Sequence, residues 1–301
     1  MFNKVKLTLC AFLPKKLLTK IVGWIANRDC GYITTIIIKI FVWFYNIDMS
    51  EVQNPNINSY HTLNDFFIRT LKKNMRPIDN DSLFLSLPAD GTISQLGNIK
   101  GEQIFQAKNH FYTLNNLLGN NERLATQFLD GTFITIYLSP RDYHRIHMPC
   151  NGILSEMIYI PGKLNSLNSF NVLNIKNLFA ENERLICVFK TDYGPMIQIL
   201  VGAIIVGSIE TVWAGIVSST SSKKIIKYWQ YSTHDKNKSI VLLKGQEMGC
   251  FRLGSTVINL FIKNHVKFVE DIKINNKTRV GQTLAINLFH FHKNTKNNKY
   301  K

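Results

Sequence analysis

Residues 133–138 read Phe-Ile-Thr-Ile-Tyr-Leu, and this run is the starting point for the fold. Its side chains are β-branched or aromatic, and turn-forming pairs bound it, Asp130-Gly131 before it and Ser139-Pro140 after it. This composition between these boundaries predicts a β-strand. Similar runs recur at 185–190, 196–206, 239–243 and 256–262. Many short strands separated by glycine turns favour a β-sandwich or barrel.

The first part of the chain has a different character. Residues 1–28 contain six Lys and Arg residues and no acidic residue. Leu17, Leu18, Ile21, Val22 and Ile25 recur at helical spacing, with the lysines elsewhere on the helical wheel. A basic amphipathic helix of this kind can lie in the interface of an anionic bilayer.

A second apolar stretch covers residues 32–47 and includes Lys39. It is shorter than the roughly 20 residues that span a bilayer, so a buried core helix and an interfacial helix both stay open. The shorter apolar run at residues 7–13 ends at Pro14 and has no small-residue cleavage site after it, unlike a secretory signal. We therefore predict an α+β protein with an N-terminal amphipathic helical membrane-binding arm, residues 1–75, and a β-rich, sandwich- or barrel-like body, residues 76–301.

Composition limits the possible partners. The chain has 301 residues, 45% of them hydrophobic, which suits a folded protein with a sizeable core. Its formal charge of +16 indicates an anionic partner, either a membrane surface or nucleic acid. The sequence contains no P-loop and no nucleic-acid-binding motif. The five cysteines form no C-x-x-C pair, so neither a zinc site nor a disulfide framework is indicated, which fits a reducing compartment.

Three segments contain residue types that can carry chemistry. Residues 87–93 read Leu-Pro-Ala-Asp-Gly-Thr-Ile and include Asp90. Residues 139–149 place His144 and His147 three apart beside Asp142, a spacing that suits acid/base work better than zinc because no further His or Cys completes a ligand set. Residues 244–258 contain three closely spaced glycines and end in Leu-Gly-Ser-Thr-Val-Ile. The missing Cβ of Gly254 lets the following hydroxyl approach the Gly254 carbonyl.

These segments together resemble the phosphatidylserine decarboxylase family in its bacterial, membrane-associated form. Further matching motifs follow in order at 64–69, 76–78, 160–164, 182–184, 201–203, 206–209 and 213–215. The resemblance spans roughly residues 10–290. Several motifs that agree in order and spacing are far more specific than any one of them.

The resemblance implies a role for each matching residue. Ser255 matches the self-cleaving serine, Asp90 and His147 match the pair that activates it, and His144 matches a histidine of the decarboxylation step. Asp142 is an alternative or auxiliary residue to orient His147. Ser255 would attack the Gly254 carbonyl, and the chain would separate into 1–254 and 255–301 while Ser255 becomes a pyruvoyl group.

The implied reaction needs no metal and no pyridoxal phosphate. The pyruvoyl carbonyl would form a Schiff base with phosphatidylserine and accept the electron pair released with CO2, as pyridoxal phosphate does elsewhere. Phosphatidylethanolamine would be the product, with His144 or a water as proton donor. The implied partners are phosphatidylserine and an anionic membrane surface, with no nucleic acid. The two chains would form a heterodimer, a higher oligomer stays open, and the location is the cytoplasmic side of the cell membrane, as a peripheral protein.

Two other classes of protein fit parts of the pattern. A serine hydrolase could use the same Asp90, His147 and Ser255, although the sequence lacks G-x-S-x-G. A non-catalytic β-domain is the second alternative, because the segment 244–256 also resembles a glycine-punctuated segment of sugar-phosphotransferase carrier domains. A fold shared with such domains would not fix the function.

Overall fold

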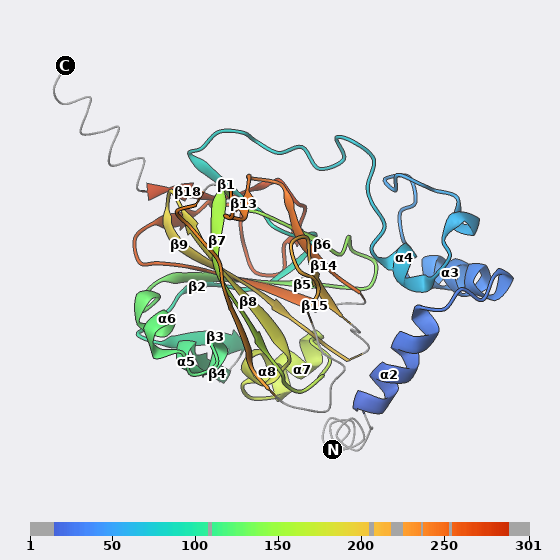
Figure 1. Cartoon of the computed structure of the whole chain (residues 1–301), viewed down its shortest axis with the longest axis horizontal. Coiled ribbons are helices and arrows are strands. Elements are labelled where there is room, and N and C mark those ends of the chain that lie inside the picture. Colours follow the sequence, from blue (N-terminus) through green and yellow to red (C-terminus); the bar gives the residue numbers. More distant parts are fainter. Residues whose placement is uncertain are drawn as a thin grey trace.

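The computed structural model describes residues 15–107, 110–204, 208–217, 225–235, 237–252 and 255–288, with the backbone alone at residues 15–20 and 255. Helices of the N-terminal region lie on one side of a β-rich body (Figure 1). These helices are α2 (Lys15–Ala26), α3 (Tyr32–Tyr45), a short 3-10 helix (Ile57–Ser59) and α4 (Leu63–Phe67). The α+β architecture predicted from the sequence is confirmed. The division at residue 75 stays a prediction, and it falls in the segment between α4 and the first strand.

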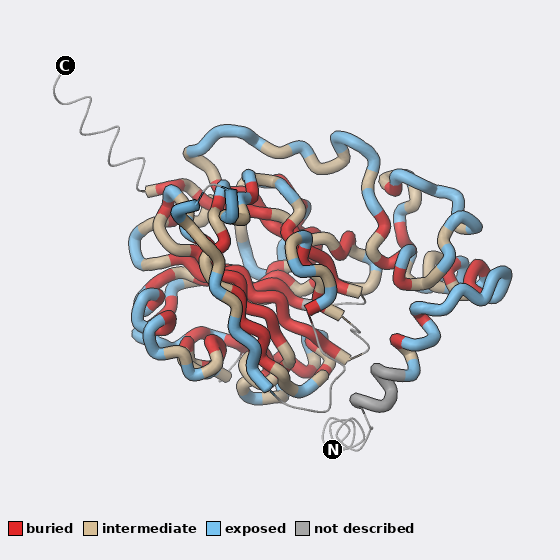
Figure 2. Tube along the Cα trace, viewed as in Figure 1, coloured by how far each residue is buried: buried red, intermediate tan, exposed pale blue. Residues whose placement is uncertain are grey.

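A nine-stranded antiparallel sheet forms the centre of the body. Its order is β12-β7-β8-β9-β15-β5-β2-β17, and β13 also pairs with β7. Its strands are β2 (Gly91–Asn98), β5 (Thr132–Leu138), β7 (Gly152–Ile160), β8 (Arg184–Thr191), β9 (Gly194–Val201), β12 (Lys227–Gln230), β13 (Val241–Leu242), β15 (Ser255–Phe261) and β17 (Lys277–Thr278). The middle strands are buried along most of their length, as the red segments of Figure 2 show. Both faces of these strands are covered, and their sequences are accordingly near-continuous runs of Ile, Val, Leu and Phe.

Strand β15 holds the central position that matters most for the site. It pairs with β5 from Ser255 to Phe261 and with β9 from Thr256 to Phe261. Both edges of the strand are therefore hydrogen-bonded inside the sheet. The sequence predicted a core strand at 256–262, and the structure confirms it within one residue at each end.

Smaller sheets and short helices complete the body. A four-stranded sheet, β11-β10-β14-β6, places residues 145–147 beside residues 247–251. A three-stranded sheet, β1-β18-β16, and the hairpin β3-β4 lie at the periphery. The strands are β1 (Phe84–Ser86), β3 (Gln103–Ala107), β4 (His110–Thr113), β6 (Arg145–His147), β10 (Ile209–Thr211), β11 (Gly215–Ile216), β14 (Glu247–Phe251), β16 (Val266–Phe268) and β18 (Thr283–Asn287). The helices are α5 (Leu114–Leu117), α6 (Glu122–Gln127), α7 (Ser169–Asn174) and α8 (Leu178–Glu181).

The strand predicted at 196–206 is too long at its C-terminal end. Strand β9 ends at Val201, which pairs with Arg184 at the start of β8; residues 202–204 are not part of the strand, and residues 205 and 206 lie outside the described residues. The run at 239–243 contributes only the two residues of β13. These strand ends were predicted from apolar composition alone, which does not indicate where the chain leaves the sheet.

Helices α2 and α3 expose much of their apolar surface. Trp24 of α2 and Trp43 of α3 are 58% and 80% exposed. Helix α3 buries only Thr34, Thr35 and Ile38, mainly by packing Ile38 and Phe41 against Phe66 of α4. A buried core helix at residues 32–47 is therefore wrong, and the outward face of the helix is aliphatic and aromatic. None of the helices that the structure describes is both long and apolar enough to cross a membrane.

Candidate active site

His147 ends β6 and is held at both ring nitrogens. Its Nδ1 lies 2.8 Å from the carbonyl oxygen of Gly245, and a carbonyl can only accept, so Nδ1 carries the proton. Its Nε2 therefore has the lone pair, which accepts a hydrogen bond from Tyr143 Oη at 3.2 Å. Burial lowers the pKa of His147, while the Gly245 carbonyl and the charges of Glu247 and Asp90 act in the opposite direction. His147 is a neutral imidazole with a basic Nε2 at neutral pH.

A glycine fixes the carbonyl that orients His147. Gly245 has φ of +77°, in the left-handed region, and a Cβ there would lie 2.6 Å from the Ile78 side chain. Glycine alone suits both conditions. The glycine spacing seen in the sequence thus has a local cause at this position.

His144 is fully buried in the segment that leads to β6. Its Nδ1 donates to the carbonyl oxygen of Asp142 at 2.7 Å, which again leaves the lone pair on Nε2. No hydrogen-bond partner for Nε2 lies among the residues that the structure describes. Burial, together with the nearby charge of Arg69, lowers the pKa of His144 to about 3. An unpartnered buried acceptor is costly, so it marks a position where a ligand or reacting group would be accommodated.

The backbone brings this histidine segment beside residue 255. Ser255 opens β15 directly opposite Leu138, and residues 139–144 continue from there to His144. The amide of Phe251, just before the cleavage segment, donates to the carbonyl of His144 at 3.1 Å. The side chain of Ser255 and the whole of Gly254 lie outside the described residues. The two histidines and the predicted cleavage point thus share one end of strands β5 and β15.

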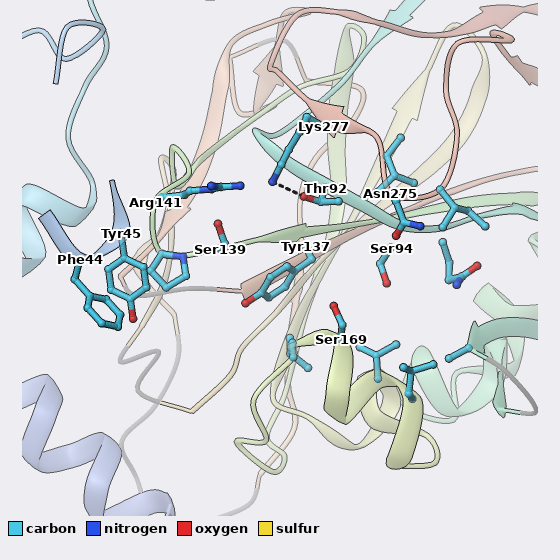
Figure 3. Close-up of a pocket in the computed structure, with 18 residues that line it drawn as sticks. Phe44, Tyr45, Thr92, Ser94, Tyr137, Ser139, Arg141, Ser169, Asn275 and Lys277 are labelled. Carbon is cyan, nitrogen blue, oxygen red and sulfur yellow. Dashed lines mark hydrogen bonds between the residues drawn. The ribbon is translucent and has the colours of Figure 1, made fainter. Parts of the chain in front are cut away.

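A pocket of about 650 Å³ opens at the same end of β5. Tyr137 and Ser139 line it together with Thr92 of β2, and Phe44 and Tyr45 extend to it from α3 (Figure 3). Its remaining lining combines aliphatic side chains with polar and basic ones. The pocket therefore connects the exposed apolar arm with the end of the central strands.

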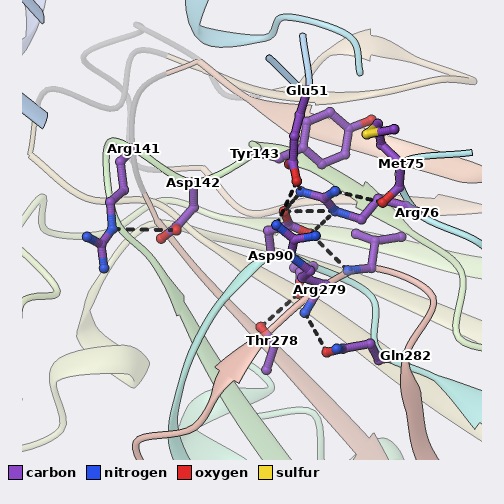
Figure 4. A network of polar contacts seen from close by, with 12 residues as sticks. Glu51, Met75, Arg76, Asp90, Arg141, Asp142, Tyr143, Thr278, Arg279 and Gln282 are labelled. Atoms are coloured by element: carbon purple, nitrogen blue, oxygen red, sulfur yellow. Dashed lines mark hydrogen bonds and ion pairs between the residues drawn. The ribbon is translucent and has the colours of Figure 1, made fainter. Parts of the chain in front are cut away.

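Asp90 lies at the start of β2 in a network of charged groups (Figure 4). Arg76 Nε donates to both Asp90 carboxylate oxygens at 3.0 Å, and its Nη2 bridges Asp90 and Glu51. The amide of Val280 donates to Asp90 at 2.8 Å, and Arg279 pairs with Glu51 at 2.6 Å. This network ties Asp90 to the N-terminal region and to the segment after Ser255.

The predicted residues are only partly in contact. Asp90 lies close enough to His147 for its charge to raise the histidine pKa, but in the described structure its hydrogen bonds go to Arg76 and Val280. The Asp142 carboxylate accepts from the backbone N and the Oγ of Ser139 at 2.7 and 2.6 Å. Asp142 thus orients His144 through its carbonyl, and no contact of its carboxylate with His147 occurs in the described part.

The residues that hold this site had no role predicted from the sequence. Arg76, Glu51 and Arg279 anchor Asp90, and Tyr143 contacts His147. A sequence signal for Arg76 existed, because a buried aspartate needs a cation and Arg76 belongs to a matching motif. Glu51 and Arg279 are far from Asp90 in sequence and had no such signal. Among the described residues, no group of three or more His, Cys, Asp or Glu side chains could hold a metal ion.

Comparisons with known proteins identify the family of this chain. The family model described as phosphatidylserine decarboxylase matches residues 63–286, and a second model, described as PSD, matches residues 5–46. The chain is 55% identical to the phosphatidylserine decarboxylase proenzyme of Erwinia tasmaniensis, over 95% of both chains. It is 56% identical to the proenzyme of Sodalis glossinidius, over 95% of this chain and 96% of the relative, and 54% identical to that of Escherichia coli, over 95% and 88%. With these matches over nearly its whole length, the chain belongs to the phosphatidylserine decarboxylase family.

Proposed function

We propose that this chain is a self-processing enzyme that decarboxylates phosphatidylserine to phosphatidylethanolamine. Family membership and the names of its relatives support the reaction. The observation in this chain that carries the proposal is the pair of neutral histidines, His144 and His147, on the segment that begins beside residue 255. Each presents an unprotonated Nε2, as proton transfer at neutral pH requires.

Self-cleavage needs a base for Ser255, because a serine hydroxyl is a poor nucleophile. We assign this role to His147, whose Nε2 already accepts a hydrogen bond from the Tyr143 hydroxyl. Ser255 Oγ would attack the Gly254 carbonyl carbon, and the amide C–N bond would break as an ester forms. β-Elimination would break the ester at Cβ of residue 255. Hydrolysis with loss of ammonia would then leave a pyruvoyl group.

Asp90 would act on His147 through its charge. A negative charge near the imidazole stabilises the imidazolium that forms when His147 takes the serine proton. The Asp90 charge acts to raise the pKa of His147 against the effect of burial, which supports this role. Arg76 and Val280 hold the Asp90 carboxylate in position for it.

The decarboxylation step would use His144. A pyruvoyl group at residue 255 would supply an electron-accepting carbonyl for the electron pair released with CO2. The unpartnered, buried Nε2 of His144 fits such a neighbouring group. His144 is unprotonated in the free site, with a pKa of about 3. We assign to it, or to a water that it orients, the delivery of a proton to the carbon that loses CO2.

The helical arm would bring the site to its lipid substrate. The exposed apolar faces of α2 and α3 suit interfacial insertion, and each Lys or Arg near an anionic surface adds about 1 kcal/mol. We propose peripheral binding on the cytoplasmic side of the cell membrane. After cleavage, chains 1–254 and 255–301 would stay together because β15 lies between β5 and β9.

Intact-mass measurement tests self-processing. The wild type should give two chains, one ending at Gly254 and one starting with pyruvoyl at 255, and Ser255→Ala should stay whole. His147→Gln should also stay whole, whereas His144→Gln should cleave and fail to release CO2 from phosphatidylserine. A folded wild type that remains one chain would rule out this mechanism, and labelling of Ser255 by a fluorophosphonate probe would then favour a hydrolase.

A further inference from the structure

The 650 Å³ pocket beside β5 carries an unbalanced positive charge. Its lining contains two charged residues, Arg141 and Lys277, and both are cations. The other lining residues are uncharged, and they include the aliphatic side chains Ile93, Leu167, Val172, Leu173 and Ile274. A partly apolar cavity with two cations and no lining acid suits an amphiphile that carries an anion.

Both cations retain donors for a ligand. Lys277 Nζ donates to Thr92 Oγ1 at 2.8 Å, and no carboxylate lies within ion-pair distance of it among the described residues. An ammonium group has three donors, so others remain available. Arg141 Nε lies 4.0 Å from Asp142 Oδ1, beyond hydrogen-bond distance, while both bonds from Ser139 go to the other oxygen, Asp142 Oδ2.

The two side chains are held toward one another. The Arg141 carbonyl accepts from the buried Arg69 at 2.9 Å, which fixes the backbone of that segment. Lys277 lies in β17, next to β2 at the pocket wall. Figure 3 shows the Arg141 and Lys277 side chains pointing toward each other. Because both side chains line the same pocket, they can approach a single anion there from two sides.

Arg141 and Lys277 also line a second, polar pocket of about 280 Å³. That pocket contains Asp90, whose charge acts to raise the pKa of His147, and Tyr143, which contacts the His147 ring. The cations therefore stand where an apolar space meets the polar site. A phospholipid has the same order of parts, with its phosphate between the apolar glycerol side and the polar head.

We propose that Arg141 and Lys277 bind the phosphodiester of the phospholipid substrate, while the apolar lining receives the glycerol side of the lipid. This inference rests on the proposed function. In phosphatidylserine only one ester oxygen and one methylene separate the phosphorus from the carbon that carries the amine and carboxylate. A phosphate site must therefore lie close to the reacting groups, and Arg141 is three residues before His144.

The cations suit the phosphate better than the substrate carboxylate. A strong ion pair to the carboxylate would stabilise the substrate more than the transition state, in which that charge leaves as CO2. A pair to the phosphate is unchanged through the reaction. Arg141 and Lys277 would thus contribute uniform binding, which appears in KM and leaves kcat unchanged.

The test uses purified, self-processed protein and phosphatidylserine in micelles of neutral detergent. Arg141→Gln and Lys277→Gln should each raise KM about tenfold, the size of one lost charge-assisted hydrogen bond, with kcat within about twofold. Lys267→Gln, an exposed lysine of β16 outside both pockets, is the matched control and should leave KM unchanged. Intact masses should show complete cleavage in all three variants.

A second arm separates phosphate recognition from general attraction to membranes. Binding to phosphatidylglycerol vesicles should be the same for the wild type and both pocket variants. An unchanged KM in Arg141→Gln and Lys277→Gln would overturn the site. A rise in KM accompanied by weaker binding to the vesicles would overturn it too. If Arg141→Gln fails to fold, Lys277→Gln decides the question. A processed wild type that does not decarboxylate would instead remove the proposed function, and this site with it.

Discussion

The imidazole ring of His144 lies against the phenyl ring of Phe67, with ring centroids 4.1 Å apart. Phe67 belongs to α4, and its ring also meets Phe41 of α3, with centroids 6.0 Å apart. The aromatic contacts run from the exposed helical arm to a buried histidine of the candidate site. The position of the arm and the dry environment of His144 therefore depend on the same side chain.

Replacing Phe67 should affect both stability and titration. We expect Phe67→Ala to lower the free energy of unfolding by about 3–5 kcal/mol, since a fully buried ring is lost. Water reaching His144 should raise its pKa toward 6.5. Urea unfolding in the uncleaved Ser255→Ala background and NMR titration of His144 measure the two effects. Phe111→Ala, at a half-exposed ring of β4, is the control and should change neither the free energy of unfolding nor the pKa of His144. An unaltered His144 titration in Phe67→Ala would contradict this explanation.

The protein should lose stability in acid through His144. Its pKa is about 3 when folded and near 6.5 when unfolded, so the unfolded state binds more protons between these values. Above pH 6.5 His144 is neutral in both the folded and the unfolded state, so it does not change the free energy of unfolding. As the pH drops from 6.5 toward 3, the unfolded state gains a proton that the folded state does not bind, and stability falls. At pH 5 the loss should be about 2 kcal/mol.

This effect is tested by replacing His144, and an exposed histidine serves as the control. Urea midpoints at pH 7 and pH 5 should differ less in Ser255→Ala/His144→Gln than in Ser255→Ala alone. The exposed His234 offers the comparison, and His234→Gln should keep the full acid loss. Equal losses in both variants would show that His144 does not titrate as proposed.

Gly245→Ala should slow self-cleavage. Its φ of +77° opposes alanine, and so does the Ile78 side chain, 2.6 Å from where the alanine methyl would lie, so the carbonyl that orients His147 should shift. We expect a stability loss of about 1–3 kcal/mol. The rate of chain separation, followed by intact mass during expression, measures the effect. Ile78→Ala in the same chain should recover part of the rate by removing the clash; no slowing in Gly245→Ala would contradict the role of this carbonyl.

Arg76→Gln alone should destabilise the protein more than the double change Arg76→Gln/Asp90→Asn. It leaves the buried Asp90 carboxylate with one backbone donor, at a cost of about 3 kcal/mol. Arg76→Gln/Asp90→Asn should be more stable than Arg76→Gln, because no unpaired charge remains. Urea unfolding of both in the Ser255→Ala background measures the difference. A double variant less stable than the single one would mean that Arg76 does not act by balancing Asp90.

The sequence was sufficient where local pattern decides structure. The runs at 133–138 and 256–262 form β5 and β15, since Ile, Val and Phe in short blocks between turns suit buried strands. Leu17 to Ile25 likewise lies in α2. His144 and His147 were found by their spacing, and the structure places them on one segment beside residue 255.

Long-range contacts were beyond such patterns. Nothing in residues 48–52 indicates that Glu51 meets Arg76 and Arg279, because the pairing depends on how distant segments pack. The sequence suggested that Asp90 orients His147 directly, whereas its hydrogen bonds go to Arg76 and Val280. The burial that lowers the pKa of His144 also depends on a helix 77 residues earlier, counted from Phe67 to His144.

The pairing of β15 on both edges also bears on how long each molecule can work. A reactive carbonyl made from residue 255 would be part of a strand that is held by β5 on one side and β9 on the other. Unlike a dissociable coenzyme, it could not be exchanged for a fresh copy after chemical damage. Each protein molecule would thus have a single, unrenewable reactive group, and its working lifetime would end when that group is spent.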